Sequence, residues 1–311
     1  GSSTDRIILG LGTATINTAS GGLDTITVNT QGNYLWSFAT ATVGVSLNMT
    51  SGFATFSGNI QKVTGGTMQT VQGSANGDTL IAGAGMVMLD GNGGNDTFNM
   101  GNANNSQSSA LFIVGSSTST NTLTFATNTG GLVNVDLANG TAYSGTGYAN
   151  LKGANIRAVI GSTKADTFTL GANSVAQSVT GGGGDDTITA NTGNTASSYS
   201  FSTSNGNDSF NLGLGSYTIT AGGGNDVINF SQQGSVLLQF SNSTAVNANL
   251  ATGIITQAGV SNITVQNGNV QYITGTANTD TLTGGSTTLL LDGGTGGNDI
   301  FDMGGAGTTL A

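Results

Sequence analysis

The chain of 311 residues contains no cysteine, proline or histidine, and its acidic residues are 15 aspartates with no glutamate. The absence of cysteine and histidine excludes disulfides, thiolate and imidazole metal sites, and the usual Ser-His and Cys-His catalytic arrangements. Only five residues are cationic and the net charge is −10, so no basic patch is present to bind nucleic acid or an anionic membrane. Cations are therefore the natural partners of this chain.

Long apolar runs and helix-surface residues are also missing. No run approaches about 18 apolar residues, so we expect no membrane-spanning helix. The first residues, GSSTDRIILG, lack the basic and then apolar pattern of a secretory signal peptide. Glycine accounts for 53 residues, and threonine, asparagine, valine and isoleucine are abundant, which favours strands and turns with almost no helix.

Internal repeats organise the chain. Four segments start alike, each with an aspartate just before a strand-like triplet: GSSTDRIIL at Gly1 (Asp5), GSANGDTLI at Gly73 (Asp78), GSTKADTFT at Gly161 (Asp166) and GTANTDTLT at Gly275 (Asp280). A second aspartate element follows each of them after 18 to 20 residues: Asp24, Asp96, Asp186 and Asp299. The third unit has further aspartate turns at Asp208 and Asp226. A nine-residue turn-plus-strand unit, used twice per coil, would stack these aspartates about 4.8 Å apart.

This periodicity predicts an all-β fold, a right-handed parallel β-roll or β-helix. We expect one elongated domain over residues 1–311, with irregular repeats starting near 1, 73, 161 and 275, as part of a longer protein. A second shared block ends in glycine at Val45–Gly52, Val133–Gly140 and Val246–Gly253. After each block we expect a loop and then a strand.

The glycine-rich aspartate turns are candidates for metal binding. The strongest copies are GGGGDD (181–186), AGGGND (221–226), GNGGND (91–96) and GTGGND (294–299). Glycine permits positive φ and exposes main-chain carbonyls, and a carboxylate follows. Calcium takes about six to eight such oxygen atoms, which two stacked turns can supply and one turn cannot. We therefore predict several Ca²⁺ ions at turns that include Asp24, Asp78, Asp96, Asp166, Asp186, Asp208, Asp226, Asp280, Asp299, Gly91, Gly181, Gly183, Gly222 and Gly294.

Alternative interpretations exist for several of these residues. The aspartates also have an interpretation without metal. In an Asx turn the carboxylate accepts nearby backbone N–H groups and binds no ion. STKADT and TANTDT lack the glycines and are candidates for such empty turns. Asp90 and Asp292 are either outer ligands or, by preference, solvated surface acids. Asp136 and Asp302 alternate with apolar residues, and we expect them to face solvent.

Apolar residues that recur with period two are predicted to fill the interior. They are Ile7, Leu9, Ile26, Val28, Leu80, Phe98, Phe168, Leu170, Ile188, Phe210, Leu212, Ile228, Phe230, Leu282 and Leu291. Trp36, with Tyr34 and Phe38 alternating beside it, is either an exposed binding platform or, preferably, a core or end-cap residue. Paired carboxylates can perform glycosidase chemistry. Here they lie in repeated turns, so we expect a structural ion and no enzymatic activity.

The glycine-aspartate turns, together with VDLANG (135–140) and GTANTDTLTGG (275–285), resemble the RTX (repeats-in-toxin) β-roll family of secreted bacterial proteins, whose calcium-binding nonapeptide has the form G-G-x-G-x-D. The resemblance is closest to calcium-dependent S-layer proteins and large adhesins. It implies a Gram-negative origin, type I secretion to the cell surface and folding on meeting calcium outside the cell. Three roles follow as hypotheses: a structural module of a surface array or matrix, an adhesin segment that binds a glycan or host surface, or the calcium module of a secreted hydrolase or toxin.

Overall fold

The computed structural model describes residues 4–18, 22–101, 103–104, 106–128, 131–171, 177–190, 196–240, 244–304 and 309–310. These residues form strands and a single short 3₁₀ turn, η1 (Gln107–Ser109), so the prediction of an all-β parallel solenoid is confirmed. No helix in these ranges has the length and apolar character needed to cross a membrane.

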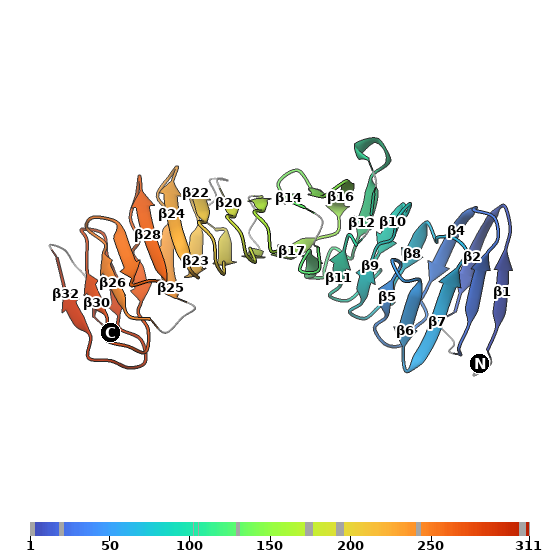
Figure 1. Ribbon diagram of the computed structural model, residues 1–311, viewed down its shortest axis with the longest axis horizontal. Helices are drawn as coiled ribbons and strands as arrows, with labels where there is room; N and C mark the ends of the chain where they lie inside the picture. The colour runs from blue at the N-terminus through green and yellow to red at the C-terminus, as the bar shows by residue number, and fades with distance from the viewer. Residues whose placement is uncertain are drawn as a thin grey trace. The chain divides into compact units, whose positions relative to one another are not determined.

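The chain forms two compact units, residues 1–160 and 161–311. The boundary falls at Gly161, where the third predicted repeat starts. Each unit contains two sheets whose strands run mostly parallel and follow one another along the stack (Figure 1). We call the sheet whose strands directly follow the aspartate turns the aspartate-side sheet, and the other the opposite sheet.

In the first unit the aspartate-side sheet has the spatial order β1 (Arg6–Leu9), β3 (Thr25–Val28), β7 (Asn59–Thr64), β6 (Phe53–Phe56), β5 (Ser46–Asn48), β9 (Thr79–Ile81), β11 (Thr97–Asn99), β13 (Asn121–Thr124) and β17 (Ile156–Ile160). The opposite sheet contains β2 (Thr13–Asn17), β4 (Asn33–Ser37), β8 (Thr70–Gln72), β10 (Met88–Asp90), β12 (Leu111–Val114), β16 (Gly147–Gly153), β15 (Thr141–Ser144) and β14 (Val133–Asp136).

In the second unit the aspartate-side sheet contains β18 (Thr167–Thr169), β20 (Thr187–Ala190), β22 (Ser209–Leu212), β24 (Gly224–Phe230), β28 (Ser261–Gln266), β27 (Ile254–Gln257), β26 (Val246–Asn249), β30 (Thr281–Thr283) and β32 (Ile300–Asp302). The opposite sheet contains β19 (Gln177–Thr180), β21 (Ser198–Ser202), β23 (Ser216–Ala221), β25 (Ser235–Phe240), β29 (Tyr272–Thr274), β31 (Leu290–Asp292) and β33 (Thr309–Leu310).

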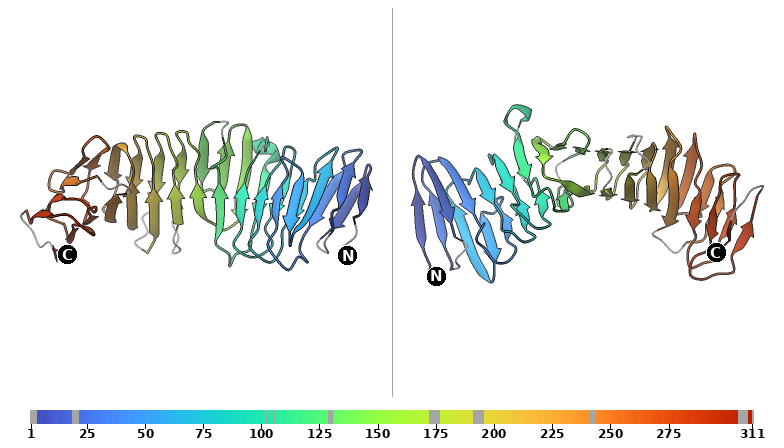
Figure 2. Two further views of the ribbon diagram at one scale, coloured as in Figure 1. Left: turned by 60° about the horizontal axis from the view of Figure 1, so that its bottom comes forward. Right: turned by 180° about the vertical axis from the view of Figure 1, so that it is seen from behind.

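The parallel register stacks identical positions of successive coils, which Figure 2 shows as strands lying side by side within each unit. In the second unit Ile188 lies beside Phe210, and Phe210 beside Ile228, and all three side chains point into the core. Because side chains alternate along a strand, the flanking threonines and asparagines face outward. Every predicted core residue is buried except Ile7, which is half-buried on β1, a strand paired only with β3 among the described residues. Trp36 and Phe38 are fully buried, so their preferred interpretation as core residues is confirmed.

The segments after the shared Val-to-Gly blocks differ from the expected loop. Each block starts a three-stranded antiparallel meander: β5–β6–β7, β14–β15–β16 and β26–β27–β28. The glycine that ends each block, Gly52, Gly140 or Gly253, has a φ of +71° to +76° and reverses the chain. The meander adds strands to one sheet of a coil, whereas the other sheet continues without interruption, as β4 pairs directly with β8.

A longer repeat relates the two units. Residues 5–101 correspond to residues 208–304, with strands β1–β11 matching β22–β32 in the same order. Asp24 and Asp226 are 202 residues apart, as are Asp78 and Asp280, and GLG occurs at 10–12 and at 213–215. The equivalent pairings recur: β3 with β7 and β24 with β28, and β5 with β9 and β26 with β30.

A tyrosine hydroxyl caps the same turn in both units, although the tyrosine comes from a different strand in each. In the first unit the Tyr34 hydroxyl, from β4, donates to the Gly10 carbonyl. In the second unit Tyr217, from the neighbouring strand β23, donates to the equivalent Gly213 carbonyl at 3.1 Å. The position equivalent to Tyr34 is Val236, so a tyrosine from either of two adjacent strands caps the same turn.

Candidate metal site: the aspartate turns

The aspartates of the repeated turns are buried despite their charge. Eight of them are at most 5% exposed: Asp24, Asp78, Asp96, Asp166, Asp186, Asp208, Asp226 and Asp280. Asp299 is half-buried, whereas Asp302 is exposed and Asp136 is half-buried at the surface. An ionised carboxylate in such a place is unfavourable unless it is hydrogen-bonded, paired or bound to a metal.

One oxygen of each turn carboxylate bonds to the neighbouring coil. The Oδ1 atom accepts the main-chain N–H of the aspartate one coil earlier, which builds a ladder along the aspartate turns. The N–H to Oδ1 distances are 2.9 Å from Asp166 to Asp186, from Asp186 to Asp208, from Asp208 to Asp226 and from Asp280 to Asp299, and 3.0 Å from Asp78 to Asp96 and from Asp5 to Asp24. Asn121 extends the ladder, since its Oδ1 accepts the Asp96 N–H at 2.8 Å.

The second oxygen, Oδ2, divides the turns into two classes. In the first class the residue four positions before the aspartate carries a hydroxyl. Its main-chain N–H donates to Oδ2, at 2.7 Å from Ser74, 2.6 Å from Ser162 and 2.6 Å from Thr276. The same three residues donate their hydroxyls to Oδ1 at 2.9, 3.0 and 3.2 Å. The carboxylates of these hydroxyl-capped turns are therefore well supplied with donors.

In the second class, which we call the open turns, Oδ2 has no donor. It is buried and without a hydrogen bond in Asp96, Asp186, Asp208 and Asp226. Three of these four belong to the glycine-rich sequences GNGGND, GGGGDD and AGGGND. Buried polar atoms without a partner are rare in folded proteins, so each of these oxygens calls for a proton or a cation.

The direction of one main-chain amide explains the difference. In two of the open turns, those of Asp96 and Asp208, the N–H four residues before the aspartate points elsewhere. Asn92, with a φ of +66°, donates its N–H to Asp90 Oδ1 at 2.8 Å, and Ser204 donates its N–H to the Gly182 carbonyl at 3.1 Å. In the turn of Asp299, which is not one of the four open turns, Gly294 lies five residues before the aspartate with a φ of +91° and donates its N–H to Asp292 Oδ1 at 2.9 Å. Asp90 and Asp292 thus orient the glycine turns.

Glycine is required where the aspartate side chain folds over the start of its own turn. A Cβ on Gly91 would lie 2.0 Å from Asp96 Oδ2, and a Cβ on Gly181 would lie 2.2 Å from Asp186 Oδ2. By contrast, a Cβ on Gly183 would have its nearest contact at 4.0 Å. The first glycine of the turn is therefore sterically necessary and the third is not.

Gly222 is needed for a different reason, the close approach of two coils. Its Cβ would lie 1.6 Å from the Ser204 carbonyl oxygen, and the next residue, Gly223, donates its N–H to that same oxygen at 2.5 Å.

Burial shifts the titration of the open turns. It raises the pKa of Asp96, Asp186 and Asp226 to about 7 from 3.8, and the N–H bond from the preceding coil only partly offsets it. Neighbouring carboxylates add to the effect: the charge of Asp208 raises the pKa of both Asp186 and Asp226. Burial also raises the pKa of Asp208, and the nearby Thr203 hydroxyl, which itself has no hydrogen-bond partner among the described residues, partly offsets this shift.

The internal repeat provides a comparison at one site. Gln61 is fully buried, and its Nε2 donates to Asp24 Oδ2 at 3.1 Å and to the Thr18 carbonyl at 2.8 Å. The equivalent neighbour of Asp226 is Ile263, which lies beside it in the sheet and has no side-chain donor. The carboxylate at this position therefore accepts a hydrogen bond from the Gln61 amide in the first copy, at Asp24, and has no donor for its Oδ2 in the second copy, at Asp226.

The open turns fit a hard cation by the chemistry of their donors. Their Oδ2 atoms are ionisable oxygens in dry surroundings, and main-chain carbonyls of adjacent coils approach the turns closely. Within the described residues no three carboxylates converge on one point, so carbonyl oxygens would have to complete the shell of a bound ion. The residues suited to hold it are Asp96, Asp186, Asp208 and Asp226, with carbonyls of the glycine turns.

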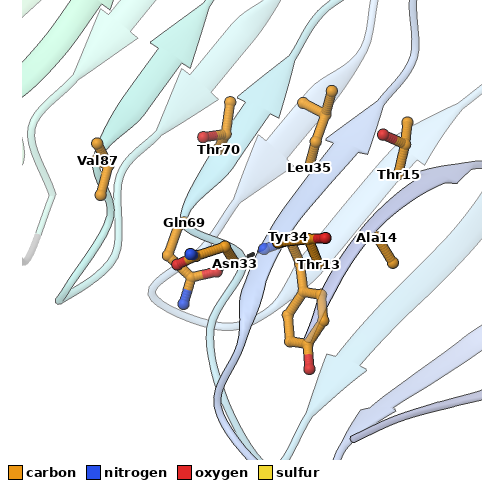
Figure 3. Close-up of a pocket in the computed structure, with 9 residues that line it drawn as sticks. All are labelled: Thr13, Ala14, Thr15, Asn33, Tyr34, Leu35, Gln69, Thr70 and Val87. Atoms are coloured by element: carbon orange, nitrogen blue, oxygen red, sulfur yellow. Dashed lines mark hydrogen bonds between the residues drawn. The ribbon is translucent and has the colours of Figure 1, made fainter. Parts of the chain in front are cut away.

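A shallow groove lies on the outer surface of the opposite sheet in the first unit, away from the aspartate turns. It has a volume of about 440 Å³. Figure 3 shows Thr15, Leu35, Thr70 and Val87 in a row along its length, with Asn33 and Gln69 at one side. Gln69 Oε1 accepts the Tyr34 N–H at 2.8 Å, which holds the amide in place. The lining is neutral, with amides and hydroxyls beside the aliphatic side chains of Ala14, Leu35 and Val87.

No protein-family model matches the chain, and no curated protein matches it. Sequence patterns identified the aspartates but missed the residues that separate the two classes of turn, Ser74, Ser162 and Thr276. The signal for them is present as G-[S/T]-x-x-x-D at 73–78, 161–166 and 275–280.

Proposed function

We propose that the chain is a calcium-dependent structural module of a secreted bacterial surface protein, of the kind that forms an S-layer-like array or matrix. The observation that carries the proposal is the set of four buried Oδ2 atoms without a donor at Asp96, Asp186, Asp208 and Asp226. Bound calcium would supply positive charge and fill these acceptor sites. The resemblance of the glycine turns to the RTX family supports the same ion and a location outside the cell.

The physical basis of calcium dependence is electrostatic. Three open-turn aspartates follow one another in the ladder of the second unit, and the charge of Asp208 raises the free energy of ionising both Asp186 and Asp226. In low calcium the folded state must bury these charges or take up protons. Extracellular calcium sites have Kd values of about 10⁻⁴ to 10⁻³ M, so the module would be loosened inside a cell and ordered outside it.

Calcium titration of the chelated protein tests the proposal. We expect circular dichroism in EDTA to show a partial loss of β structure, confined to the open turns and their coils, and millimolar Ca²⁺ but not Mg²⁺ to restore it. Asp186→Ala and Asp226→Ala should each weaken the calcium response, whereas the surface variant Asp136→Ala should not. An unchanged β spectrum and melting temperature on adding EDTA would contradict a calcium-dependent fold.

Assembly is a separate part of the proposal. Light scattering and electron microscopy after calcium addition should show sheets or filaments of the full chain. Calcium-bound particles that remain monomeric at all concentrations would leave the calcium module intact and exclude self-assembly of this chain.

A second candidate role, adhesion to a glycan, is favoured by the groove of Figure 3. Neutral amides and hydroxyls beside aliphatic side chains suit the hydroxyl groups and apolar ring faces of sugars. The equivalent of Thr70 in the second unit is Tyr272. Thr70→Tyr should therefore fill the groove and abolish binding on a glycan array, and wild-type protein that binds no glycan would exclude this role.

A further inference from the structure

The hydroxyl-capped turns contain the same buried aspartate as the open turns, yet they supply it with donors from within the chain. Asp280 Oδ1 accepts the Val246 N–H at 2.6 Å and the Thr276 hydroxyl at 3.2 Å, and its Oδ2 accepts the Thr276 N–H at 2.6 Å. Asp280 is 0% exposed. Its carboxylate thus has a donor on each oxygen and no orphaned acceptor.

The first unit repeats this arrangement. Asp78 Oδ1 accepts the Val45 N–H at 2.7 Å and the Ser74 hydroxyl at 2.9 Å, and its Oδ2 accepts the Ser74 N–H at 2.7 Å. Burial raises the pKa of Asp78, and the Val45 and Ser74 donors lower it. Two turns 202 residues apart therefore use the same three donors.

The hydroxyl also holds the turn itself. Ser74 Oγ accepts the Asn76 N–H at 3.0 Å, Ser162 Oγ accepts the Lys164 N–H at 3.1 Å, and Thr276 Oγ1 accepts the Asn278 N–H at 3.2 Å. The hydroxyl accepts from the turn and donates to the carboxylate, so it fixes the direction of the amide that reaches Oδ2.

A hydroxyl residue at this position is not sufficient. Ser204 stands four residues before Asp208, but its N–H donates to the Gly182 carbonyl, and Asp208 Oδ2 remains without a donor. The direction of the amide, and not the residue type alone, decides between the two classes. Ser204 is therefore a matched control for Thr276.

We propose that Ser74, Ser162 and Thr276 take the place of a cation in their turns, so that Asp78, Asp166 and Asp280 hold their coils without metal. The hydroxyl and main-chain N–H provide the positive ends of dipoles where calcium would provide charge in the open turns. Through the direction of their main-chain amides, these three residues exclude a cation from their own turns. The metal-free coils then border the calcium-dependent segment Asp186–Asp226 on both sides along the chain. This inference rests on the proposed calcium function for the open turns.

A count of bound calcium tests the assignment directly. The full-length chain, Asp226→Asn and Asp280→Asn are saturated with Ca²⁺, freed of excess ion, and analysed for elemental calcium per chain. We expect Asp226→Asn to bind at least one ion fewer than wild type and Asp280→Asn to bind the same number. An equal loss in Asp280→Asn would overturn the inference.

A second measurement is independent of whether the open turns bind calcium. Amide hydrogen exchange in EDTA should show the amides of Thr276 and Asn278 protected in wild type. In Thr276→Ala the Asn278 amide should exchange at least tenfold faster than in wild type, and in Thr276→Ser its protection should be restored. In Ser204→Ala the exchange rates of the amides in the turn of Asp208 should not change. Rapid exchange of residues 276–280 in chelated wild type, or no effect of Thr276→Ala, would overturn the inference. A wild type that binds no calcium while these results hold would reject the calcium function and keep the metal-free turn.

Discussion

At the scale of single residues, the residue four before the aspartate distinguishes the turn of Asp78 from the turn of Asp96. Ser74 directs its N–H at the carboxylate, whereas Asn92, one coil later, donates its N–H to Asp90 instead. A change of one amide direction therefore leaves Asp96 Oδ2 without a donor. Asp90, which sequence patterns assign to solvent, has a defined role as an acceptor for the turn.

The first glycine of an open turn should be intolerant of a side chain. Gly181→Ala would place a methyl group 2.2 Å from Asp186 Oδ2 and displace a carboxylate that is held by the Asp166 N–H. We expect a loss of about 1–3 kcal/mol in the free energy of unfolding, measured by urea denaturation in calcium. Gly183→Ala is the control, because the nearest atom would lie 4.0 Å from its methyl group. It should change the free energy of unfolding by less than about 0.5 kcal/mol. Equal effects of the two variants would refute the steric explanation.

The capping tyrosine of the second unit is a further single-residue test. The Tyr217 hydroxyl lies 3.0 Å from the Ala190 carbonyl, 3.1 Å from the Gly213 carbonyl and 3.2 Å from the Leu214 carbonyl. Burial raises the pKa of Tyr217 to about 12, so the hydroxyl stays protonated and can donate. Tyr217→Phe should lower the free energy of unfolding by about 1–2 kcal/mol, because buried carbonyls lose their donor. The half-exposed Tyr272→Phe serves as the control, and no difference between the variants in thermal melts would count against the cap.

At the scale of elements, the ladder of aspartates joins successive coils independently of the sheets. Each step is a main-chain N–H to a side-chain oxygen, placed by the parallel register that also stacks Ile188, Phe210 and Ile228 in the core. Because the register places like residues beside like, a charged position meets the same charge one coil away. Carboxylate oxygens without a donor therefore lie on three successive coils, at Asp186, Asp208 and Asp226, and not at a single turn.

The ladder should make the calcium-free protein more stable in mild acid. The folded-state pKa of Asp96, Asp186 and Asp226 is about 7, above the unfolded value of about 3.9, so the folded state binds more protons between these limits. Stability from these groups is present below about pH 4 and is lost as the pH rises through 7. In EDTA the urea midpoint should therefore be higher at pH 5 than at pH 7.5.

Saturating calcium should remove most of this pH dependence, because the ion replaces the protons. The triple variant Asp186→Asn, Asp208→Asn, Asp226→Asn provides the control and should show a flatter pH profile in EDTA than wild type. A wild-type midpoint that rises from pH 5 to pH 7.5 would contradict the raised pKa values.

The meanders are the other feature at this scale. In equivalent positions of the two units, β5–β6–β7 and β26–β27–β28 insert antiparallel strands into the aspartate-side sheet. The sequence blocks that mark them were recognisable by their terminal glycines. Their antiparallel pairing was not predicted, because short alternating stretches suit either direction and only the partner strand decides it.

At the scale of the whole molecule, the open turns are distributed unevenly between the two units. Three of the four open-turn aspartates, Asp186, Asp208 and Asp226, belong to the second unit, and Asp96 belongs to the first. The first unit holds Asp24 through Gln61 and Asp78 through Ser74. Among the described residues, the second unit therefore has more aspartate oxygens that are buried without a donor.

Separate expression of the two units should reveal this difference. Each has its own apolar interior, so we expect fragments 1–160 and 161–311 to fold when calcium is present. In circular dichroism melts, calcium should raise the melting temperature of fragment 161–311 more than that of fragment 1–160. Asp96→Asn should abolish the response of the first fragment. Equal calcium responses of the two wild-type fragments would contradict this distribution.

The amino-acid sequence alone determined the all-β parallel architecture, the interior positions and the aspartates of the turns. These features depend on local preference and on period, which are properties of the chain: glycine before aspartate turns it, and alternating apolar residues bury one face. Which turns lack a donor was decided only by the tertiary structure. GSANGD and GNGGND are similar as sequences, but the direction of one amide, the hydroxyl of Ser74 and the carboxylate of Asp90 separate them. Such bonds join atoms whose positions exist only after the coils have stacked, so the open carboxylates became visible only in the folded chain.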